Sequence, residues 1–437
     1  MTKSTLRVEQ FPGLKSRKVE ASFSGGAVTS EGGSLLLRSV DKKLGLLRKL
    51  SRVLPDGRQG GKVAHELVSL LRQRVYGIAL GYEDLNDHDS LRHDLGFQTA
   101  VNRDNELASP ATLCRLENKM DREVAVATHR VMVEAFLDSF GKAPDELILD
   151  FDATDDRVHG KQEGRFFHGY YNEYCFLPLY VFCGEQLLVS YLRQSNIDPA
   201  KHAWGILSLL VKLIRARFPH VKIIMRADSG FCRWRMFRWC ERHNVHYCVG
   251  IAKNSRLLGT AKSATDAAEK AFNQTQEKQR LFSEVCYAAE AWDKSRRIIV
   301  KAEHSELGTN PRFVVTNLDS MPEYVYDKIY CARGEMENRI KEQQLGLFAD
   351  RTSCHKWWAN QFRLLLSSLA YMLIEGIRRL ALTNTELAKA QASTIRLKLL
   401  KIGAVVTRNT RRIRFSLASG YPYQDIFWRV VKRLNTA

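Results

Sequence analysis

The sequence has few features of secreted, membrane-bound or zinc-binding proteins. Its nine cysteines form no CxxC pair and no finger-like Cys/His spacing, which argues against a structural zinc site. Their odd number and scattered positions are typical of reduced thiols in the cytosol. Residues 1–20 lack the apolar segment of a secretory signal. We therefore expect a cytoplasmic protein.

Long apolar runs and nucleotide-binding loops are also lacking. The most apolar C-terminal segment, residues 364–374, is bounded by Arg363 and Glu375. It is far shorter than the roughly 20 residues that span a bilayer, so it predicts a core helix and no membrane partner. The glycine-rich residues 24–34 lack the GK[ST] ending of a phosphate-binding loop, which argues against a P-loop ATPase.

Acidic residues are scarce relative to basic ones. The 437-residue chain has 48 Asp and Glu against 67 Lys and Arg, which gives a net charge of +19 and a pI near 9.6. Such a balance favours binding to nucleic acid, because neutralised phosphates release counterions. A basic enzyme that binds no nucleic acid is the alternative.

Hydrophobic periodicity divides the chain into five regions. Helical spacing predicts a mainly helical DNA-binding region at 1–145, with Arg115, Asn118 and Lys119 on an exposed face; a plain packing domain is the alternative. Short strands that alternate with helices then predict a mixed α/β sheet. The remaining regions are the first part of this core (146–252), a β-rich insertion (253–325), the C-terminal helices of the core (326–385) and a basic, helical tail that contacts DNA or is merely solvated (386–437).

Three acidic positions stand where regular elements begin or end. Asp152 follows Asp150 on the same face of an apolar strand, in the acid-rich stretch LILDFDATDD. Asp228 ends the apolar run VKIIMRAD, and Glu337 belongs to a predicted helix. Strand-end aspartates often only cap turns through their side chains. Carboxylates that converge from distant segments can instead hold Mg²⁺ or Mn²⁺.

The predicted helix around Glu337 also carries polar and basic residues on one face. Their spacing of three, four, four and three places them on a common side, and they are Tyr330, Arg333, Glu337, Lys341 and Gln344. Singly, such pairs are often surface ion pairs. Beside a metal site, the basic members would hold a phosphodiester.

These motifs resemble the DDE transposases of bacterial insertion sequences. The stretch YCARGEMENRIKEQQ matches a Y-x₂-R-x₃-E-x₆-K signature at Tyr330, Arg333 and Glu337, but Gln344 stands where the signature has Lys. DFDATDD resembles the first acid motif and RADSGF the second. Longer stretches, such as HGKQEGRFFHGYYNEYCFLPLYVF, resemble the thirteen-eighty family of insertion sequences. The likeness covers nearly the whole chain.

The resemblance implies an RNase H-like catalytic core and a catalytic triad of Asp152, Asp228 and Glu337 that binds two Mg²⁺ or Mn²⁺ ions. Tyr330, Arg333, Lys341 and Gln344 would contact phosphate or DNA, with Gln344 at the position of the signature's Lys. It implies cut-and-paste transposition by a homodimer that binds the terminal inverted repeats of its own element and a target DNA, in a bacterial cytoplasm near the nucleoid. Two alternatives stay open: a Mg²⁺-dependent nuclease of the same superfamily without strand transfer, and a non-catalytic DNA-binding protein derived from a transposase.

Two other groups of residues carry weaker signals. His88 and His93 lie among several acids, which suggests either a metal site or a solvated loop with helix caps. Trp357 and Trp358 suggest either stacking on a flipped base or a packing role.

Overall fold

The computed structural model describes residues 7–436. The chain forms two compact units. Unit one consists of the residues up to Lys119 together with those from Leu369 onwards, and unit two is Met120–Ser368. Within residues 7–436, no helix has both the length and the apolar character needed to cross a membrane.

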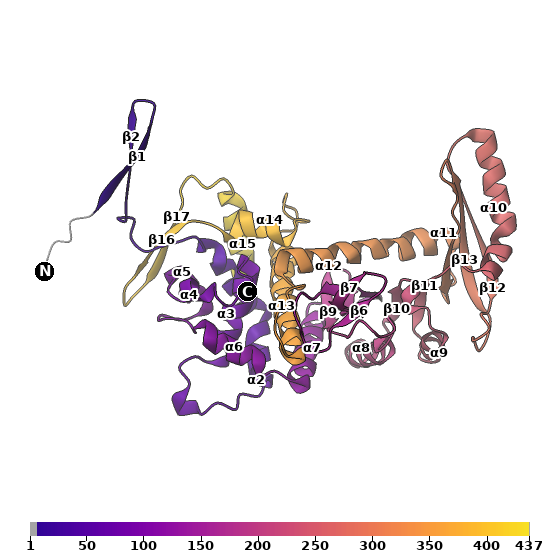
Figure 1. The fold of residues 1–437 in the computed structure, drawn as a ribbon, viewed down its shortest axis with the longest axis horizontal. Coiled ribbons are helices and arrows are strands. Elements are labelled where there is room, and N and C mark those ends of the chain that lie inside the picture. Colours follow the sequence, from indigo (N-terminus) through magenta and orange to yellow (C-terminus); the bar gives the residue numbers. More distant parts are fainter. Residues whose placement is uncertain (1–6, 437) are drawn as a thin grey trace. The chain divides into compact units, whose positions relative to one another are not determined.

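Unit two contains one nine-stranded mixed sheet flanked by helices (Figure 1). Strands β4, β8 and β9 pair antiparallel, and β10 and β11 continue from the other side of β4 in parallel. The sheet extends from β11 through β15 and β13 to β12, and β14 pairs with β13. The strands are β4 (Glu146–Ala153), β8 (Leu179–Cys183), β9 (Gln186–Tyr191), β10 (Lys222–Ala227), β11 (His246–Ile251), β12 (Gln279–Tyr287), β13 (Arg296–Ser305), β14 (Gly308–Thr309) and β15 (Arg312–Thr316). The predicted mixed sheet is confirmed.

The two faces of this sheet are covered by different helices. Alternate residues of β4, such as Leu149 and Phe151, share a core with helices α7 (Arg122–Asp138), α8 (Ala203–Arg217) and α9 (Trp234–Arg242). Because side chains alternate along a strand, Ile148, Asp150 and Asp152 point to the opposite face. The acidic residues therefore lie on the side away from α7, α8 and α9.

Part of that opposite face is covered by one continuous helical segment with an irregular pitch. It starts with α11 (Pro322–Tyr324), passes through a π-helical turn (Val325–Tyr330) and a 3₁₀ turn (Cys331–Arg333), and ends as α12 (Gly334–Leu347). The π-helical turn packs on apolar residues of β10, β11, β13 and β15: Ile224, Cys248, Ile299 and Val314. Isolated π-helical turns occur frequently at functional sites.

The region predicted as a β-rich insertion combines a helix with strands of the central sheet. Helix α10 (Ser255–Thr275) is capped by Asn254, which accepts a hydrogen bond from the backbone N–H of Leu257, and it packs on β12 and β13. β15 pairs with β11 in the central sheet, so the strands of this region widen that sheet. The alanine- and lysine-rich start of the region suits the exposed face of such a helix.

Unit one is largely helical, with a C-terminal hairpin. Its described helices include α1 (Leu35–Leu44), α2 (Leu46–Val53), α3 (Leu67–Leu80), α4 (His88–Leu91), α5 (Leu95–Val101), α6 (Pro110–Asn118), α14 (Ala392–Ile395) and α15 (Gln424–Asn435). A hairpin of β1 (Val8–Leu14) and β2 (Arg17–Ser22) precedes them. The boundary between the units falls within α13 (Trp357–Ala381).

The tail that was predicted as helical also contains two strands. β16 (Ala404–Arg408) and β17 (Ile413–Leu417) form an antiparallel pair, and β16 also pairs with β3 (Val28–Thr29). Ala404 and Val406 are buried, whereas Val405 and Thr407 between them are exposed. This period of two is typical of a half-buried strand and explains the difference.

Two of the residues that carry the weaker sequence signals, His88 and Trp357, lie in packed surroundings, whereas His93 is exposed. His88 is fully buried, and burial together with the charge of Arg74 lowers its pKa to about 3. It is therefore neutral and accompanies a buried ion pair between Arg74 and Glu117, whose nitrogen and oxygen are 2.8 Å apart. Trp357 packs edge-on against Phe176, with ring centroids 5.3 Å apart.

Candidate active site

The register of two neighbouring parallel strands brings the first two predicted acids together. β10 pairs with β4 so that Arg226 lies beside Asp150 and Ala227 beside Phe151. Asp228 and Asp152 each come one residue after this last pair. Parallel neighbours are about 4.8 Å apart, so both carboxylates leave the same edge of the sheet on the same face. Asp228 also caps the following 3₁₀ turn, because its Oδ1 accepts a hydrogen bond from the N–H of Gly230 at 2.9 Å.

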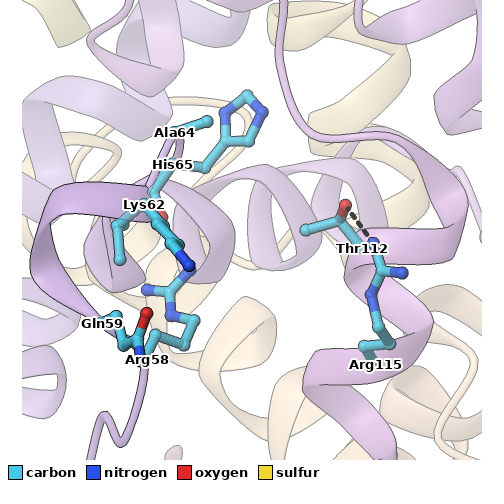
Figure 2. Close-up of a pocket in the computed structure, with 8 residues that line it drawn as sticks. Arg58, Gln59, Lys62, Ala64, His65, Thr112 and Arg115 are labelled. Atoms are coloured by element: carbon cyan, nitrogen blue, oxygen red, sulfur yellow. Dashed lines mark hydrogen bonds between the residues drawn. The ribbon is translucent and has the colours of Figure 1, made fainter.

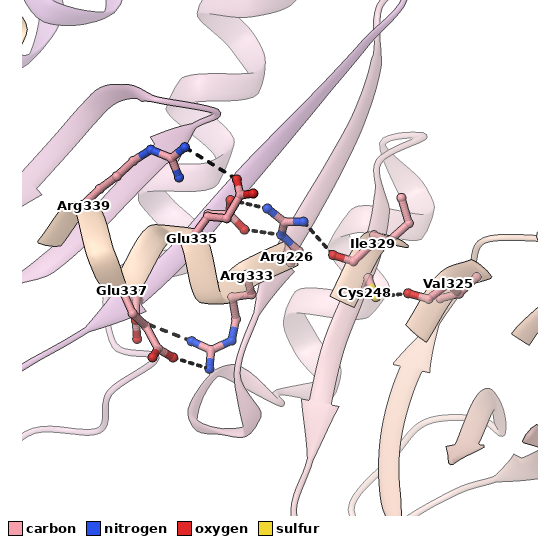
Figure 3. Close-up of polar contacts among 10 residues, drawn as sticks. Arg226, Cys248, Val325, Ile329, Arg333, Glu335, Glu337 and Arg339 are labelled. Carbon is pink, nitrogen blue, oxygen red and sulfur yellow. Dashed lines mark hydrogen bonds and ion pairs between the residues drawn. The ribbon is translucent and has the colours of Figure 1, made fainter. Parts of the chain in front are cut away.

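Arg333 connects the first and third predicted acids. Its guanidinium donates to Glu337 Oε1 at 2.8 Å and lies 3.5 Å from Asp152 Oδ2. Glu337 is in the first turn of α12, and Figure 3 shows Arg333 directed back towards it. The irregular helical segment therefore places Glu337 and Arg333 over the edge of the sheet that carries Asp152.

The electrostatics of this cluster disfavour an uncompensated negative charge. Burial, together with the charges of Asp228 and Glu337, raises the pKa of Asp152 to about 7 against the opposing effect of Arg333. Asp152 is therefore partly protonated at neutral pH in the absence of a further cation. A bound cation would reverse this preference, since an opposite charge close by favours the ionised form.

The donor set suits a hard divalent cation only after a rearrangement. Within residues 7–436, no three His, Cys, Asp or Glu side chains lie close enough together to hold a metal ion. Arg333 occupies the space between Asp152 and Glu337 and compensates both of them. The carboxylate chemistry fits Mg²⁺ or Mn²⁺, and Arg333 would have to release the two acids for all three to converge.

Asp150 has a different partner from Asp152. Arg226 holds it with a two-pronged ion pair, in which one nitrogen is 2.6 Å from Asp150 Oδ2. The remaining guanidinium nitrogen donates to the carbonyl of Ile329 at 2.6 Å (Figure 3). Both side chains are almost inaccessible, at 8% for Arg226 and 3% for Asp150. The pair therefore fastens β4 and β10 to the π-helical turn that precedes Arg333.

Asp155 and Asp156, the other two acids of the stretch LILDFDATDD, also differ from each other in their surroundings. Asp155 is half-buried, and its backbone carbonyl accepts a hydrogen bond from Gln344 Nε2 at 3.0 Å. Asp156 is fully buried, and burial together with the charge of Asp350 raises its pKa well above the usual range. The four acids of the stretch LILDFDATDD therefore lie in separate environments.

The remaining predicted site residues lie along the same helical segment. Tyr330 is largely buried, and burial raises its pKa. Its hydroxyl is 2.5 Å from the point where a Cβ on Gly250 would be, and the N–H of Ser229 is 3.1 Å from that point. Lys341 is exposed on α12. Gln344 holds the loop after β4, so it supports the position of Asp155.

Two residues that support this site were missed at the sequence level. Arg226 stands two positions before Asp228 and so shares its face of the strand, which was an available signal. Gly250 carries no comparable signal, because its role depends on how closely Tyr330 approaches β11.

Comparisons with known proteins agree with the family suggested by these motifs. A family model described as "Transposase DDE domain group 1" matches residues 11–437. The fold is similar to the piggyBac transposase in a synaptic complex with hairpin DNA, at 8% sequence identity and a TM-score of 0.41. That similarity covers 92% of this chain and 81% of the other. No curated protein matches the chain.

Proposed function

Because the chain belongs to the family of transposases with a DDE domain, we propose that it cleaves phosphodiester bonds at the ends of a DNA element and joins the freed ends to a target. The observation that carries this proposal is that Asp152 and Asp228 follow neighbouring strand positions at one edge of the sheet, while Arg333 bridges Asp152 to Glu337. The finer assignment to the thirteen-eighty family rests on the motifs themselves. The strand order, with three antiparallel strands followed by two parallel ones, supports an RNase H-like core.

In this proposal the three acids hold two divalent ions, Mg²⁺ or Mn²⁺. When bound, such ions polarise the scissile phosphate and stabilise both the attacking and the leaving oxygen. Asp152, Asp228 and Glu337 supply the carboxylate ligands. Arg333, once released from Asp152 and Glu337, is free to pair with a phosphate oxygen, for which its planar, forked donor set is well suited.

The other residues of the segment position the DNA. Tyr330 lies against Gly250 and the turn that follows Asp228, where its hydroxyl can orient a phosphate. Lys341 is exposed one turn beyond Glu337 and adds positive charge. Gln344 acts indirectly by holding the loop of Asp155. We propose that a homodimer acts on paired ends, since joining both ends of an element to one target requires two active sites.

A cleavage and joining assay tests the proposal. The substrate is a labelled duplex from the end of the element that encodes this chain, incubated with Mg²⁺ and a plasmid target. The wild type is expected to cut the end and join it to the plasmid. Asp228→Asn and Glu337→Gln are expected to bind the duplex normally and to cut at least about a hundredfold more slowly, as is typical when charge stabilisation is removed from a reaction centre.

Each other outcome of this assay favours a definite alternative. Cut ends that are never joined to the plasmid would indicate a Mg²⁺-dependent nuclease of the same superfamily. A wild type that binds the ends and never cuts them would indicate a non-catalytic DNA-binding protein. If both variants cut like the wild type, the active site lies elsewhere.

The close approach of Tyr330 to β11 gives a further prediction. Gly250→Ala would place a Cβ 2.5 Å from the Tyr330 hydroxyl, so the ring must move. Displacement of a positioning group by about 1 Å can cost on the order of a hundredfold in rate, and overpacking costs about 1–3 kcal/mol of stability. We expect a folded protein with strongly reduced cleavage, measured with the same labelled duplex.

Gly259→Ala is the matched control for this substitution. Gly259 lies in α10, where an added Cβ meets no atom within 4 Å. Alanine is a better helix former than glycine by about 1 kcal/mol, so this variant should be slightly more stable and fully active. Equal activity of the two variants would show that Tyr330 does not position the DNA.

A further inference from the structure

A pocket with basic walls lies in unit one, which does not include the residues of the candidate active site. It has a volume of about 390 Å³ and is shown in Figure 2. One wall comes from the loop and 3₁₀ turn between α2 and α3, and the other from the first turns of α6. The lining residues are Arg58, Gln59, Lys62, Val63, Ala64, His65, Thr112 and Arg115. None of them is acidic, and three carry permanent positive charge.

Arg58 is held rigidly at the edge of this pocket. Its Nε and one terminal nitrogen donate to the two oxygens of Asp56 at 2.7 and 2.6 Å, and the other terminal nitrogen donates to the carbonyl of His65 at 2.8 Å. These contacts fix the loop against the segment that leads into α3. Because Arg58 balances the negative charge of Asp56, this acid does not neutralise the other basic residues of the pocket.

The charges of Lys62 and Arg115 are not compensated. Within residues 7–436, Lys62 makes no side-chain hydrogen bond or ion pair, and it is exposed. Arg115 donates from one nitrogen to Thr112 Oγ1 at 3.1 Å (Figure 2), which leaves its charge available. A concave surface with several like charges focuses the electrostatic potential and attracts a counter-ion.

His65 reports on the same positive field. Burial and the charges of Arg103 and Arg58 lower its pKa, so the ring is neutral at pH 7. Its Nδ1 is buried and has no hydrogen-bond partner. A bound anion would oppose both neighbouring cations, and the pKa of His65 would then rise.

The form of the pocket indicates which anion fits. Gly57, Gly60 and Gly61 lie in the same segment between α2 and α3, and a Cβ on any of them would meet no atom within 4 Å, so the backbone at these positions is not packed against other residues. The lining includes no Phe, Tyr or Trp on which a base could stack, and no carboxylate to bind a ribose hydroxyl. The chemistry therefore suits a phosphate group and offers nothing specific to a nucleoside.

We propose that this pocket binds a phosphate of the DNA backbone and so fixes unit one on the duplex independently of base sequence. The inference rests on the proposed function for its ligand, since a transposase must bind DNA. Phosphate contacts of this kind set the position of a protein on DNA, and base contacts elsewhere supply specificity. The pocket is lined by Arg115, which was predicted from the sequence to lie on an exposed face, and by residues 58–65, for which no role was predicted.

Salt-dependent binding tests the pocket without any cleavage. Affinity of the full chain for a duplex of unrelated sequence is measured in EDTA at several salt concentrations, for the wild type and for Lys62→Ala/Arg115→Ala. Loss of one phosphate contact should reduce the slope of log K against log salt by about 0.9. We expect that change, with an affinity about tenfold lower at moderate salt.

Lys42→Ala/Arg48→Ala is the control, because it removes the same charge from exposed helical positions of unit one outside the pocket. An equal change of slope in both double variants, or no change in the pocket variant, would overturn the proposal. Since no cutting is measured, the result stands whether or not the protein proves to be a transposase. Likewise, a binding result that overturns the pocket proposal would not affect the outcome of the cleavage assay.

Titration of His65 by NMR distinguishes the source of the phosphate. The resonance is assigned by its absence in His65→Gln. Addition of duplex should raise the pKa of His65, whereas inorganic phosphate at the same phosphate concentration should have little effect, because a duplex makes further contacts that a free ion lacks. An equal rise with inorganic phosphate would show a site for free anions and overturn the assignment to DNA. A pKa unmoved by either ligand would show that the pocket binds no phosphate.

Discussion

Asp152→Asn is expected to make the protein more stable and, at the same time, inactive. Asp152 is buried beside Asp228 and Glu337, and its pKa is raised to about 7. An amide of the same shape removes this unfavourable charge, so the free energy of unfolding above pH 7 should rise by roughly 2–4 kcal/mol. Cleavage of the labelled duplex should fall by on the order of a thousandfold, since a metal ligand is lost. Opposite changes in stability and activity are typical of functional residues.

The pH dependence of stability identifies the cause of this gain. The pKa of Asp152 in the folded protein, about 7, lies above the ordinary value of 3.8. The folded state therefore holds a proton that the unfolded chain has lost, and stability decreases between about pH 4 and pH 7 and then levels off. Urea unfolding in EDTA should show this decrease in the wild type, and the part due to Asp152 should be missing in the variant. Parallel pH profiles for the two proteins would contradict the prediction.

The sequence predicted much of this site because its acids obey local rules. Asp152 and Asp228 each end an apolar strand, and strand ends of one sheet tend to meet at one edge. Arg333 and Glu337 are four residues apart, which places them on one helical face. The sheet itself could be predicted from short strands that alternate with helices. Each of these inferences rests on patterns that can be read within short segments of the sequence.

The remaining features depend on contacts between distant elements. The pairing of Arg226 with Asp150 follows from the register of β10 on β4, which local pattern does not encode. The π-helical and 3₁₀ turns before α12 depart from regular α-helical pitch, so a helical face predicted across them is not regular. Gln344 donates to the carbonyl of Asp155, a contact that its position in the sequence does not indicate. Antiparallel pairing of β15 with β11 likewise joins segments more than sixty positions apart. Strand preferences depend on such neighbours more than helix preferences do.

The second large effect is expected at Asp150, two residues before Asp152 on the same face of β4. Asp150→Asn makes the same chemical change, yet it removes the partner of a buried arginine. Arg226 would keep its hydrogen bond to Ile329, but its charge would be uncompensated in surroundings where only 8% of the side chain is exposed. Breaking a buried ion pair from one side costs about 3–5 kcal/mol, so urea unfolding at pH 8 should show a loss of this size.

A double substitution separates this structural role from a catalytic one. In Asp150→Leu/Arg226→Met both charges are absent, and apolar pairs of similar volume often match the stability of the ion pair that they replace. The double variant should therefore recover most of the stability that Asp150→Asn loses. If Asp150 serves only to balance the charge of Arg226, cleavage should return with the fold. A stable but inactive double variant would show that cleavage needs Asp150 itself or the hydrogen bond from Arg226 to Ile329. A destabilised Asp152→Asn would show that the two aspartates play the same structural role.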